Sequence, residues 1–347
     1  MRLTPDVTLT SVAERAGVSV ATASRALRGS GEMSDDTRAR IARAAAELGY
    51  SAVGRRRGRP RRGTSLIDLV LGHFHDPYTQ EITAGARTTA SALGYDLVLT
   101  TERDDPADDW PERIRSRGSA GVIIGLIVPT STQIATMRAA GIPLVLMEPP
   151  SEASRPLPSL RITDAAGGEA AARHLVQNGA RRFIAIGGAP SYRYGRARVD
   201  GFTRALEDAA PGAPYVRTSA DWSAWDAQRA CTRALAELGE LGGDGPIGVF
   251  SCSDEMAAGV YRAVAQSGRS IPHDVLVVGF DDVRSARWLH PPLTTIRQPI
   301  REAASEAVRI LARAAAGEDL STEPIVMPTE LVERASTRRA GRAGLSP

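Results

Sequence analysis

The sequence contains no lysine, so all 43 of its basic residues are arginine. Cysteine is scarce too: Cys231 and Cys252 show no metal-ligand or redox spacing, and we expect both to be reduced, buried thiols. No apolar run approaches the roughly 20 residues that a membrane-spanning helix needs. Residues 1–10 lack the apolar segment of a signal peptide. We therefore expect a cytoplasmic protein without a membrane partner.

Charge is distributed unevenly along the 347 residues. Residues 1–63 hold 13 arginines and 6 acidic residues, whereas acidic residues exceed basic ones in the remainder, 34 to 30. Basic charge concentrated in the first fifth of a chain indicates a polyanionic partner.

The first 50 residues predict three short helices. The first is a short amphipathic segment that begins near residue 10 and ends at Gly17, the second runs from Ser19 to about residue 27, and the third from Ser34 to residue 48. Two helices joined by a tight turn are typical of a helix-turn-helix unit. An ordinary alanine-rich helix with incidental polar groups is the alternative for the second segment.

Residues 51–63 interrupt every regular pattern. They contain two internal glycines, a proline and six arginines, which favours a linker that is extended when free.

From residue 64 the chain alternates apolar strands with alanine-rich helices, which predicts an α/β fold of doubly wound parallel sheets. More than five such strand–helix units are too many for a single sheet. We therefore expect two subdomains within residues 64–340. We place the first subdomain at about 64–178 and 297–327 and the second at about 179–296 and 328–340. The predicted strands are residues 66–71, 95–101, 121–128, 143–147, 183–187, 247–251 and 275–280.

Ligands of open α/β sheets bind beyond the carboxyl ends of the strands. Two such sheets facing one another therefore predict a ligand cleft between the subdomains.

The second helix supplies candidate DNA contacts, because its N-terminal half enters the major groove in helix-turn-helix proteins. Small apolar side chains there can contact thymine methyl groups, arginine can bind guanine, and hydroxyls can bind phosphates. Further candidates lie before and after this helix and within the linker. Together the predicted DNA contacts are Thr8, Ser19, Val20, Ala21, Thr22, Ser24, Arg25, Arg28, Arg57 and Arg59.

Several segments together resemble the lac repressor (LacI/GalR) family. The similarity is densest at residues 291–299, PPLTTIRQP, and covers nearly the whole chain in the family's order. The matching segments are residues 7–27, 34–38, 47–50, 198–202, 253–257, 278–282 and 291–299.

The resemblance implies a homodimer that binds a pseudo-palindromic operator and a core like that of periplasmic sugar-binding proteins. A small-molecule effector in the cleft then alters operator affinity. Arg198, Ser253 and Asp281 fall on positions that contact the effector in the family, and Trp222 matches an aromatic residue that packs against sugar rings. The chemistry fits, because arginine donates to vicinal hydroxyls, aspartate accepts from them, and indole stacks on a C–H face.

The opposite wall of the cleft is predicted to follow the first core strand, where His75 and Tyr78 are candidate ligand contacts. The neighbouring His73 and Asp76 raise the alternative of a metal site, but the spacing does not match the usual ligand patterns. We expect no metal and no cofactor. Tyr192, together with nearby arginines, either lines the cleft or faces solvent.

Two features depart from the family. Ser253 stands where many members carry asparagine, which makes the effector class harder to predict. The linker lacks the leucine that many members insert into the minor groove. Its Arg57 and Arg59 instead flank a glycine in a segment that resembles an AT-hook. The linker therefore either lies in a narrow minor groove or is a basic tether that contacts phosphates nonspecifically.

We predict a ligand-responsive transcriptional regulator, most simply a repressor of sugar uptake or catabolism, located with the nucleoid. No catalytic constellation is visible, so we do not expect an enzyme. One alternative is a sugar-binding or sugar-modifying protein with an incidental basic arm, and another is an architectural minor-groove protein. The last ten residues carry no leucine heptads, which favours a dimer over a tetramer.

Overall fold

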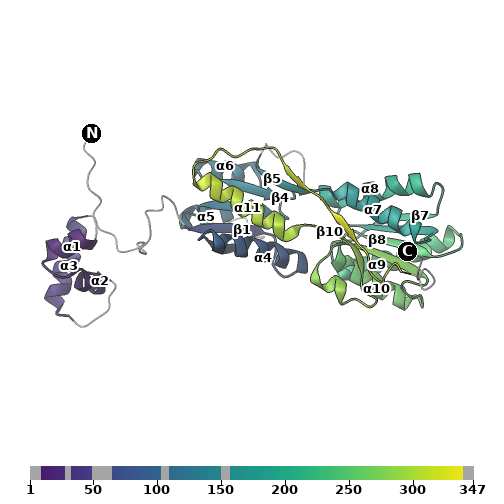
Figure 1. Cartoon of the computed structure of the whole chain (residues 1–347), viewed down its shortest axis with the longest axis horizontal. Coiled ribbons are helices and arrows are strands. Elements are labelled where there is room, and N and C mark those ends of the chain that lie inside the picture. The colour runs from purple at the N-terminus through teal and green to yellow at the C-terminus, as the bar shows by residue number, and fades with distance from the viewer. Residues whose placement is uncertain (1–8, 28–32, 49–64, 103–108, 150–156, 339–347) are drawn as a thin grey trace, which may run out of the picture. The chain divides into compact units, whose positions relative to one another are not determined.

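The computed structural model describes residues 9–27, 33–48, 65–102, 109–149 and 157–338. The chain divides into two compact units, Met1–Arg62 and Gly63–Pro347 (Figure 1). The predicted linker falls at this division but lies outside the described residues, as do four predicted DNA contacts: Thr8, Arg28, Arg57 and Arg59.

The smaller unit consists of three helices around a core of small side chains. They are α1 (Leu9–Ala16), α2 (Val20–Leu27) and α3 (Asp35–Glu47). Gly17 turns the chain between α1 and α2 with a φ of 64°, a conformation that favours glycine. The core is formed mainly by alanines, with Ile41 as its largest fully buried side chain. The predicted helix-turn-helix fold is confirmed.

The first subdomain of the larger unit is a six-stranded parallel sheet in the order β11-β5-β4-β3-β1-β2. Helices α4 and α11 pack on one face and α5 and α6 on the other. The strands are β1 (Leu66–Leu71), β2 (Asp96–Thr101), β3 (Gly121–Gly125), β4 (Leu144–Met147), β5 (Ser159–Ile162) and β11 (Ile325–Met327). The helices are α4 (Pro77–Ala92), α5 (Trp110–Arg117), α6 (Ser131–Ala139) and α11 (Ile300–Ala315).

The second subdomain repeats this arrangement in the order β12-β10-β9-β8-β6-β7, with β12 antiparallel to β10. Its strands are β6 (Arg182–Gly187), β7 (Tyr215–Ser219), β8 (Ile247–Ser251), β9 (Val275–Asp281), β10 (Thr294–Arg297) and β12 (Glu330–Val332). Its helices are α7 (Asp164–Gln177), α8 (Arg193–Ala209), α9 (Ala224–Glu240), α10 (Asp254–Gln266) and the short 3-10 helix η1 (Arg284–Arg287).

Aromatic packing covers one face of the second sheet. Four buried phenylalanines pack between this face and helices α7 and α8, and two of them, Phe202 of α8 and Phe250 of β8, stack with ring centroids 5.0 Å apart. The two helices can approach closely because Gly168 has no side chain: a Cβ there would lie 1.9 Å from the carbonyl oxygen of Arg198. Helices α9 and α10 cover the opposite face with aliphatic side chains.

The subdomain limits differ from the prediction at one point. We expected the first subdomain to continue to residue 178, but α7 packs against α8 and against strands β8, β9 and β10 of the second sheet. The chain therefore crosses between subdomains at Thr163, before α7. It crosses back after β10 and again between β11 and β12 (Figure 1).

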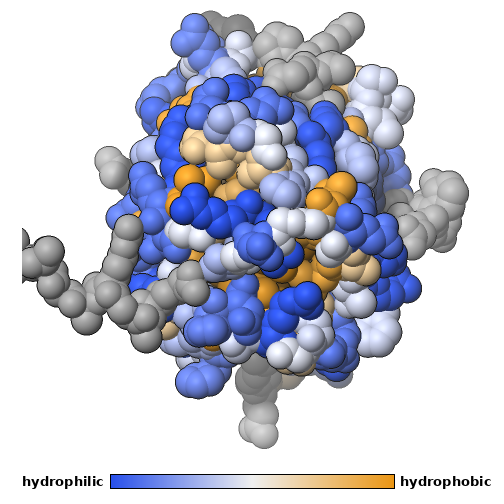
Figure 2. Space-filling view, turned by 90° about the vertical axis from the view of Figure 1, so that its right-hand side faces the viewer, coloured by the Kyte–Doolittle hydropathy of each residue, from blue (hydrophilic) through white to orange (hydrophobic). Residues whose placement is uncertain are grey.

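All seven predicted strands are present with small shifts at their ends, and the structure adds β5, β7, β10, β11 and β12. The predicted α/β fold of two doubly wound sheets is thus confirmed. No helix in the described part of the chain is both long and apolar enough to span a bilayer. The surface of the larger unit at its second-subdomain end is largely hydrophilic, with hydrophobic residues gathered in patches near the middle of the view (Figure 2).

Candidate functional site

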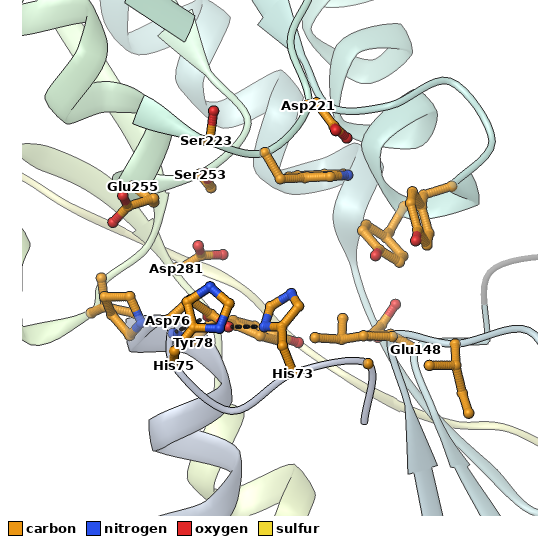
Figure 3. Close-up of a pocket in the computed structure, with 18 of the residues that line it drawn as sticks. His73, His75, Asp76, Tyr78, Glu148, Asp221, Ser223, Ser253, Glu255 and Asp281 are labelled. Carbon is orange, nitrogen blue, oxygen red and sulfur yellow. Dashed lines mark hydrogen bonds and ion pairs between the residues drawn. The ribbon is translucent and has the colours of Figure 1, made fainter. Parts of the chain in front are cut away.

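A cavity of about 640 Å³ lies between the two subdomains. Loops and strand ends at the carboxyl edges of both sheets form its walls, which is where open α/β sheets bind ligands (Figure 3). The structure brings together there all six residues predicted to bind the ligand: His75, Tyr78, Arg198, Trp222, Ser253 and Asp281.

The wall on the first subdomain begins with the loop between β1 and α4. Asp76 caps α4 by accepting hydrogen bonds from the backbone nitrogens of Tyr78 (2.8 Å) and Thr79 (3.0 Å). Its other oxygen lies 2.8 Å from Nδ1 of His73, whose ring lies 4.7 Å from that of His75 (Figure 3). Asp76 is thus occupied in holding this loop. Among the described residues, no group of three or more His, Cys, Asp or Glu side chains is placed to hold a metal ion.

Arg198 is fixed rigidly in the wall on the second subdomain. Its side chain is 4% exposed, and its Nε donates to Asp164 Oδ1 at 2.9 Å. One terminal nitrogen donates to the carbonyl oxygen of Cys252 at 2.8 Å, and the guanidinium carbon lies 3.9 Å from the ring centroid of Phe280. This buried framework orients a strong hydrogen-bond donor at the cavity.

Asp281 ends β9 next to Arg198, with 3.7 Å between its Oδ1 and the arginine nitrogen Nη1. Its φ of 117° is rare for a non-glycine residue and directs the chain at the cavity edge. Gln298 donates a hydrogen bond to its carboxylate, and burial raises the pKa of Asp281 to about 7. Ser253 lines the cavity but also caps α10, since its Oγ accepts from the nitrogen of Met256 at 3.2 Å.

Three aromatic rings form one side of the cavity. Trp222 lies 5.4 Å from Tyr194 and 6.2 Å from Tyr192, measured between ring centroids. A Cβ on Gly188 would lie 2.0 Å from the indole, so glycine is needed for the ring to pack here. The Trp222 Nε1 is buried without a hydrogen-bond partner. The indole can therefore stack on a ligand and also donate a hydrogen bond to it.

Glu148, which was not among the predicted site residues, follows β4 and directs its carboxyl group into the cavity (Figure 3). Its Oε2 accepts a hydrogen bond from Arg193 at 2.9 Å, and its Oε1 is buried without a partner. Burial and the charge of Asp164 raise the pKa of Glu148 to about 8. The available signal was a carboxylate directly after an apolar strand, whereas Asp281 was identified by its position in a segment that resembles the family.

The second helix of the small unit presents a distinct face. Ala23 and Ala26 are buried against the other helices, while the opposite side of α2 is open. Ser19 caps α2, since its Oγ accepts from the nitrogen of Thr22 at 3.1 Å. The predicted contacts on this helix divide into the exposed Ser19, Val20, Ala21 and Arg25 and the half-buried Thr22 and Ser24.

The chain is similar to known proteins over nearly its whole length. Residues 8–52 match the family described as bacterial regulatory proteins, lacI family, and residues 172–337 match a periplasmic binding protein-like domain. An uncharacterized HTH-type transcriptional regulator in the aml 5′ region of Streptomyces limosus is 33% identical over 95% of this chain and 94% of that relative.

Two solved structures are similar to nearly the whole chain. The complex of the transcriptional regulator CelR with cellobiose is 28% identical, with a TM-score of 0.70 over 95% of this chain and 100% of that one. The lac repressor dimer bound to operator and the anti-inducer ONPF is 26% identical, with a TM-score of 0.70 over 96% of this chain and 99% of that one.

Proposed function

The chain belongs to the lacI family of bacterial regulatory proteins, and from this premise we propose that it represses genes of sugar uptake or catabolism under the control of a carbohydrate effector. The observation that supports this most directly is the cavity between the subdomains. Arg198 and Asp281 offer a buried donor and acceptor there, and Trp222 offers an aromatic surface. This combination suits the hydroxyls and the C–H face of a sugar ring.

A neighbouring structure supports the carbohydrate assignment. CelR, which has the same fold over 95% of this chain, was solved with cellobiose. A cavity of about 640 Å³ lies within the range of about 300–1,000 Å³ typical of small-molecule sites. We infer no catalytic step for this chain, and we place it in the cytoplasm with the nucleoid.

We infer that α2 reads the operator in the major groove. Val20 and Ala21 are exposed at its N-terminal end, where they can contact thymine methyl groups, and the exposed Arg25 can bind guanine. Replacing Arg25 with alanine should cost about 1–3 kcal/mol of operator affinity and relax specificity at one base pair. Arg43→Ala is the matched control, because it removes the same charge from an exposed position on α3.

We infer a homodimer, since a two-fold operator is matched by a two-fold protein. The lac repressor structure that is similar to this chain is a dimer on its operator. Two exposed tryptophans of the second subdomain, Trp225 (62% exposed) and Trp288 (73% exposed), supply apolar surface for such an interface.

The proposal is tested with the full-length protein in two steps. Selection from a library of random double-stranded DNA should enrich a pseudo-palindromic sequence. A thermal-shift panel of mono- and disaccharides should identify ligands, since a ligand at 100 times its dissociation constant stabilises by about 2.7 kcal/mol. A sugar from this panel should then change the affinity for the selected DNA.

The outcome also separates the proposal from its main alternative. A sugar-binding protein with an incidental basic arm would bind sugar but enrich no sequence, and Arg25→Ala and Arg43→Ala would weaken DNA binding equally. Selection of a specific sequence with unequal effects of the two substitutions supports the regulator.

A further inference from the structure

The buried charges around the cavity do not balance. Three carboxylates, Glu148, Asp164 and Asp281, are each at most 6% exposed. Two guanidinium groups face them: Arg193 lies 2.9 Å from Glu148 and 3.4 Å from Asp164, and Arg198 lies 2.9 Å from Asp164 and 3.7 Å from Asp281. With every group ionised, this cluster carries one uncompensated negative charge. Such a charge is costly in a desolvated site.

The uncompensated charge faces the cavity at Glu148. Its Oε2 is paired with Arg193, but its Oε1 has no hydrogen-bond partner although it is buried. The carboxyl group points into the cavity (Figure 3). Burial and Asp164 raise the pKa of Glu148 to about 8, so a proton balances the charge in the ligand-free protein near neutral pH. A cation delivered by a ligand can replace this proton.

The remaining lining residues add negative charge. Asp76, Glu102, Asp221 and Glu255 also line the cavity, whereas Arg198 is the single arginine among the described lining residues. Asp76 is paired with His73, but the other three increase the negative potential around any ligand. A phosphorylated or carboxylated sugar would therefore be repelled from this cavity.

Taking the proposed carbohydrate effector as its basis, we propose that the effector is an amino sugar whose ammonium group binds Oε1 of Glu148. The ammonium restores charge balance in the cluster and supplies the donor that Oε1 lacks. The rings of Tyr194 and Trp222 accommodate the sugar face, and aromatic faces also attract a cation. The buried Nε1 of Trp222 is left to donate to a ligand oxygen.

The test compares matched sugars by isothermal titration of the full-length protein. Each amino sugar of the gluco, galacto and manno series is measured beside its neutral parent and its N-acetyl derivative. At least one amino sugar should bind about tenfold more tightly than both neutral partners, because a charge-assisted hydrogen bond exceeds a neutral one by about 1.4 kcal/mol.

Substitution at Glu148 then shows whether this carboxylate causes the preference. Glu148→Gln keeps the shape and can still accept a hydrogen bond from Arg193, and it should abolish the preference for the amine. Glu306→Gln is the control, because it removes another arginine-paired carboxylate, on α11 outside the cavity. It should bind the amino sugar as the wild type does.

A second measurement follows the proton. At pH 6.5 the amino sugar should displace the proton from Glu148, and titrations in buffers of different ionisation enthalpy should show net proton release that is lost in Glu148→Gln, which keeps the titrating Asp281. Absence of release contradicts the inference.

Other outcomes distinguish failure of this inference from failure of the proposed function on which it rests. A neutral sugar that binds as tightly as its amino counterpart overturns the amine assignment but leaves the carbohydrate-responsive regulator intact. Failure of every sugar in all three series to bind also overturns the amine assignment, whereas the wider panel of mono- and disaccharides still tests the carbohydrate effector and operator selection tests the DNA-binding function.

Discussion

Arg193, at the start of α8 in the second subdomain, donates a hydrogen bond of 2.9 Å to Glu148, which follows β4 in the first. The same guanidinium also reaches Asp164, 3.4 Å away in its own subdomain. This ion pair therefore joins the two walls of the cavity at a carboxylate that a ligand can contact. A ligand at Glu148 acts directly on a contact that holds the subdomains together, which couples binding to their relative orientation.

Removing this connection should weaken communication between effector and operator. We expect Arg193→Gln to bind operator normally in the absence of effector but to lose about 1–3 kcal/mol of coupling. The measurement is operator affinity with and without the saccharide that most stabilises the wild type. Arg196→Gln is the control, because Arg196 lies on the same helix but donates to the carbonyl oxygen of Pro190 in its own subdomain. An unchanged response in Arg193→Gln would show that this ion pair carries no coupling.

The raised pKa of Glu148 predicts a specific pH dependence. The folded protein keeps this proton up to about pH 8, whereas the unfolded chain releases it at the ordinary pKa, so the folded state binds more protons in between. The stability contributed by this proton is present at low pH and is lost as the pH rises toward 8. The wild-type melting temperature should therefore fall more between pH 5.5 and 8.5 than that of Glu148→Gln. Parallel curves would contradict the assignment.

Substitutions on the second wall should separate effector binding from operator binding. Asp281→Ala removes a buried acceptor and should weaken effector binding by about 1.5–3 kcal/mol with little change in operator affinity. Arg198→Ala should do the same and also lower the stability by about 3–5 kcal/mol, because it removes a buried partner of Asp164. Titration calorimetry and thermal melts measure the two effects. Asp200→Ala, at an exposed position on α8, is the control. If both wall variants bind the effector as tightly as Asp200→Ala does, Arg198 and Asp281 are not ligand contacts.

The fold was predictable from sequence because its signals are local. Apolar runs such as residues 66–71 and 247–251 show their strands directly, whereas β11 and β12 have three residues each and depend on pairing with distant strands. The periodicity of α7 predicts a helix but does not tell which sheet it covers. For this reason we predicted that the first subdomain continues to residue 178, whereas it ends before α7.

The candidate site divides in the same way. Asp281 and Trp222 fall on positions that the resemblance to the family singled out, and the structure places both at the cavity. Glu148 precedes Pro149 outside every segment that resembles the family, and its importance depends on Arg193, 45 residues away in the chain. Charge balance within a cluster is a property of the assembled fold, so inspection of the sequence did not reveal it.

The exposed tryptophans predict the surface through which two copies associate. Trp288→Ser removes a side chain that is 73% exposed, so it should spare the fold but weaken the dimer. Sedimentation at micromolar concentration should show monomer for this variant and dimer for the wild type. Leu241→Ser, at a residue that is 56% exposed, is the control for loss of apolar surface elsewhere. A dimer of unchanged affinity in Trp288→Ser would exclude this surface.

The arginines of the linker are predicted either to read the operator centre or to bind phosphates as a tether. Arg57 and Arg59 lie outside the described residues, and the prediction depends on the sequence alone. If they enter the minor groove, they sense its width, because A·T tracts narrow the groove and deepen its negative potential. Replacing both with alanine should then weaken binding to an A·T-centred operator more than to a G·C-centred one. A phosphate tether would instead lose affinity equally on both operators, with a salt dependence shallower by about one unit for each lost contact. Affinities for both operators at two salt concentrations distinguish these cases, and equal losses would identify the linker as a tether.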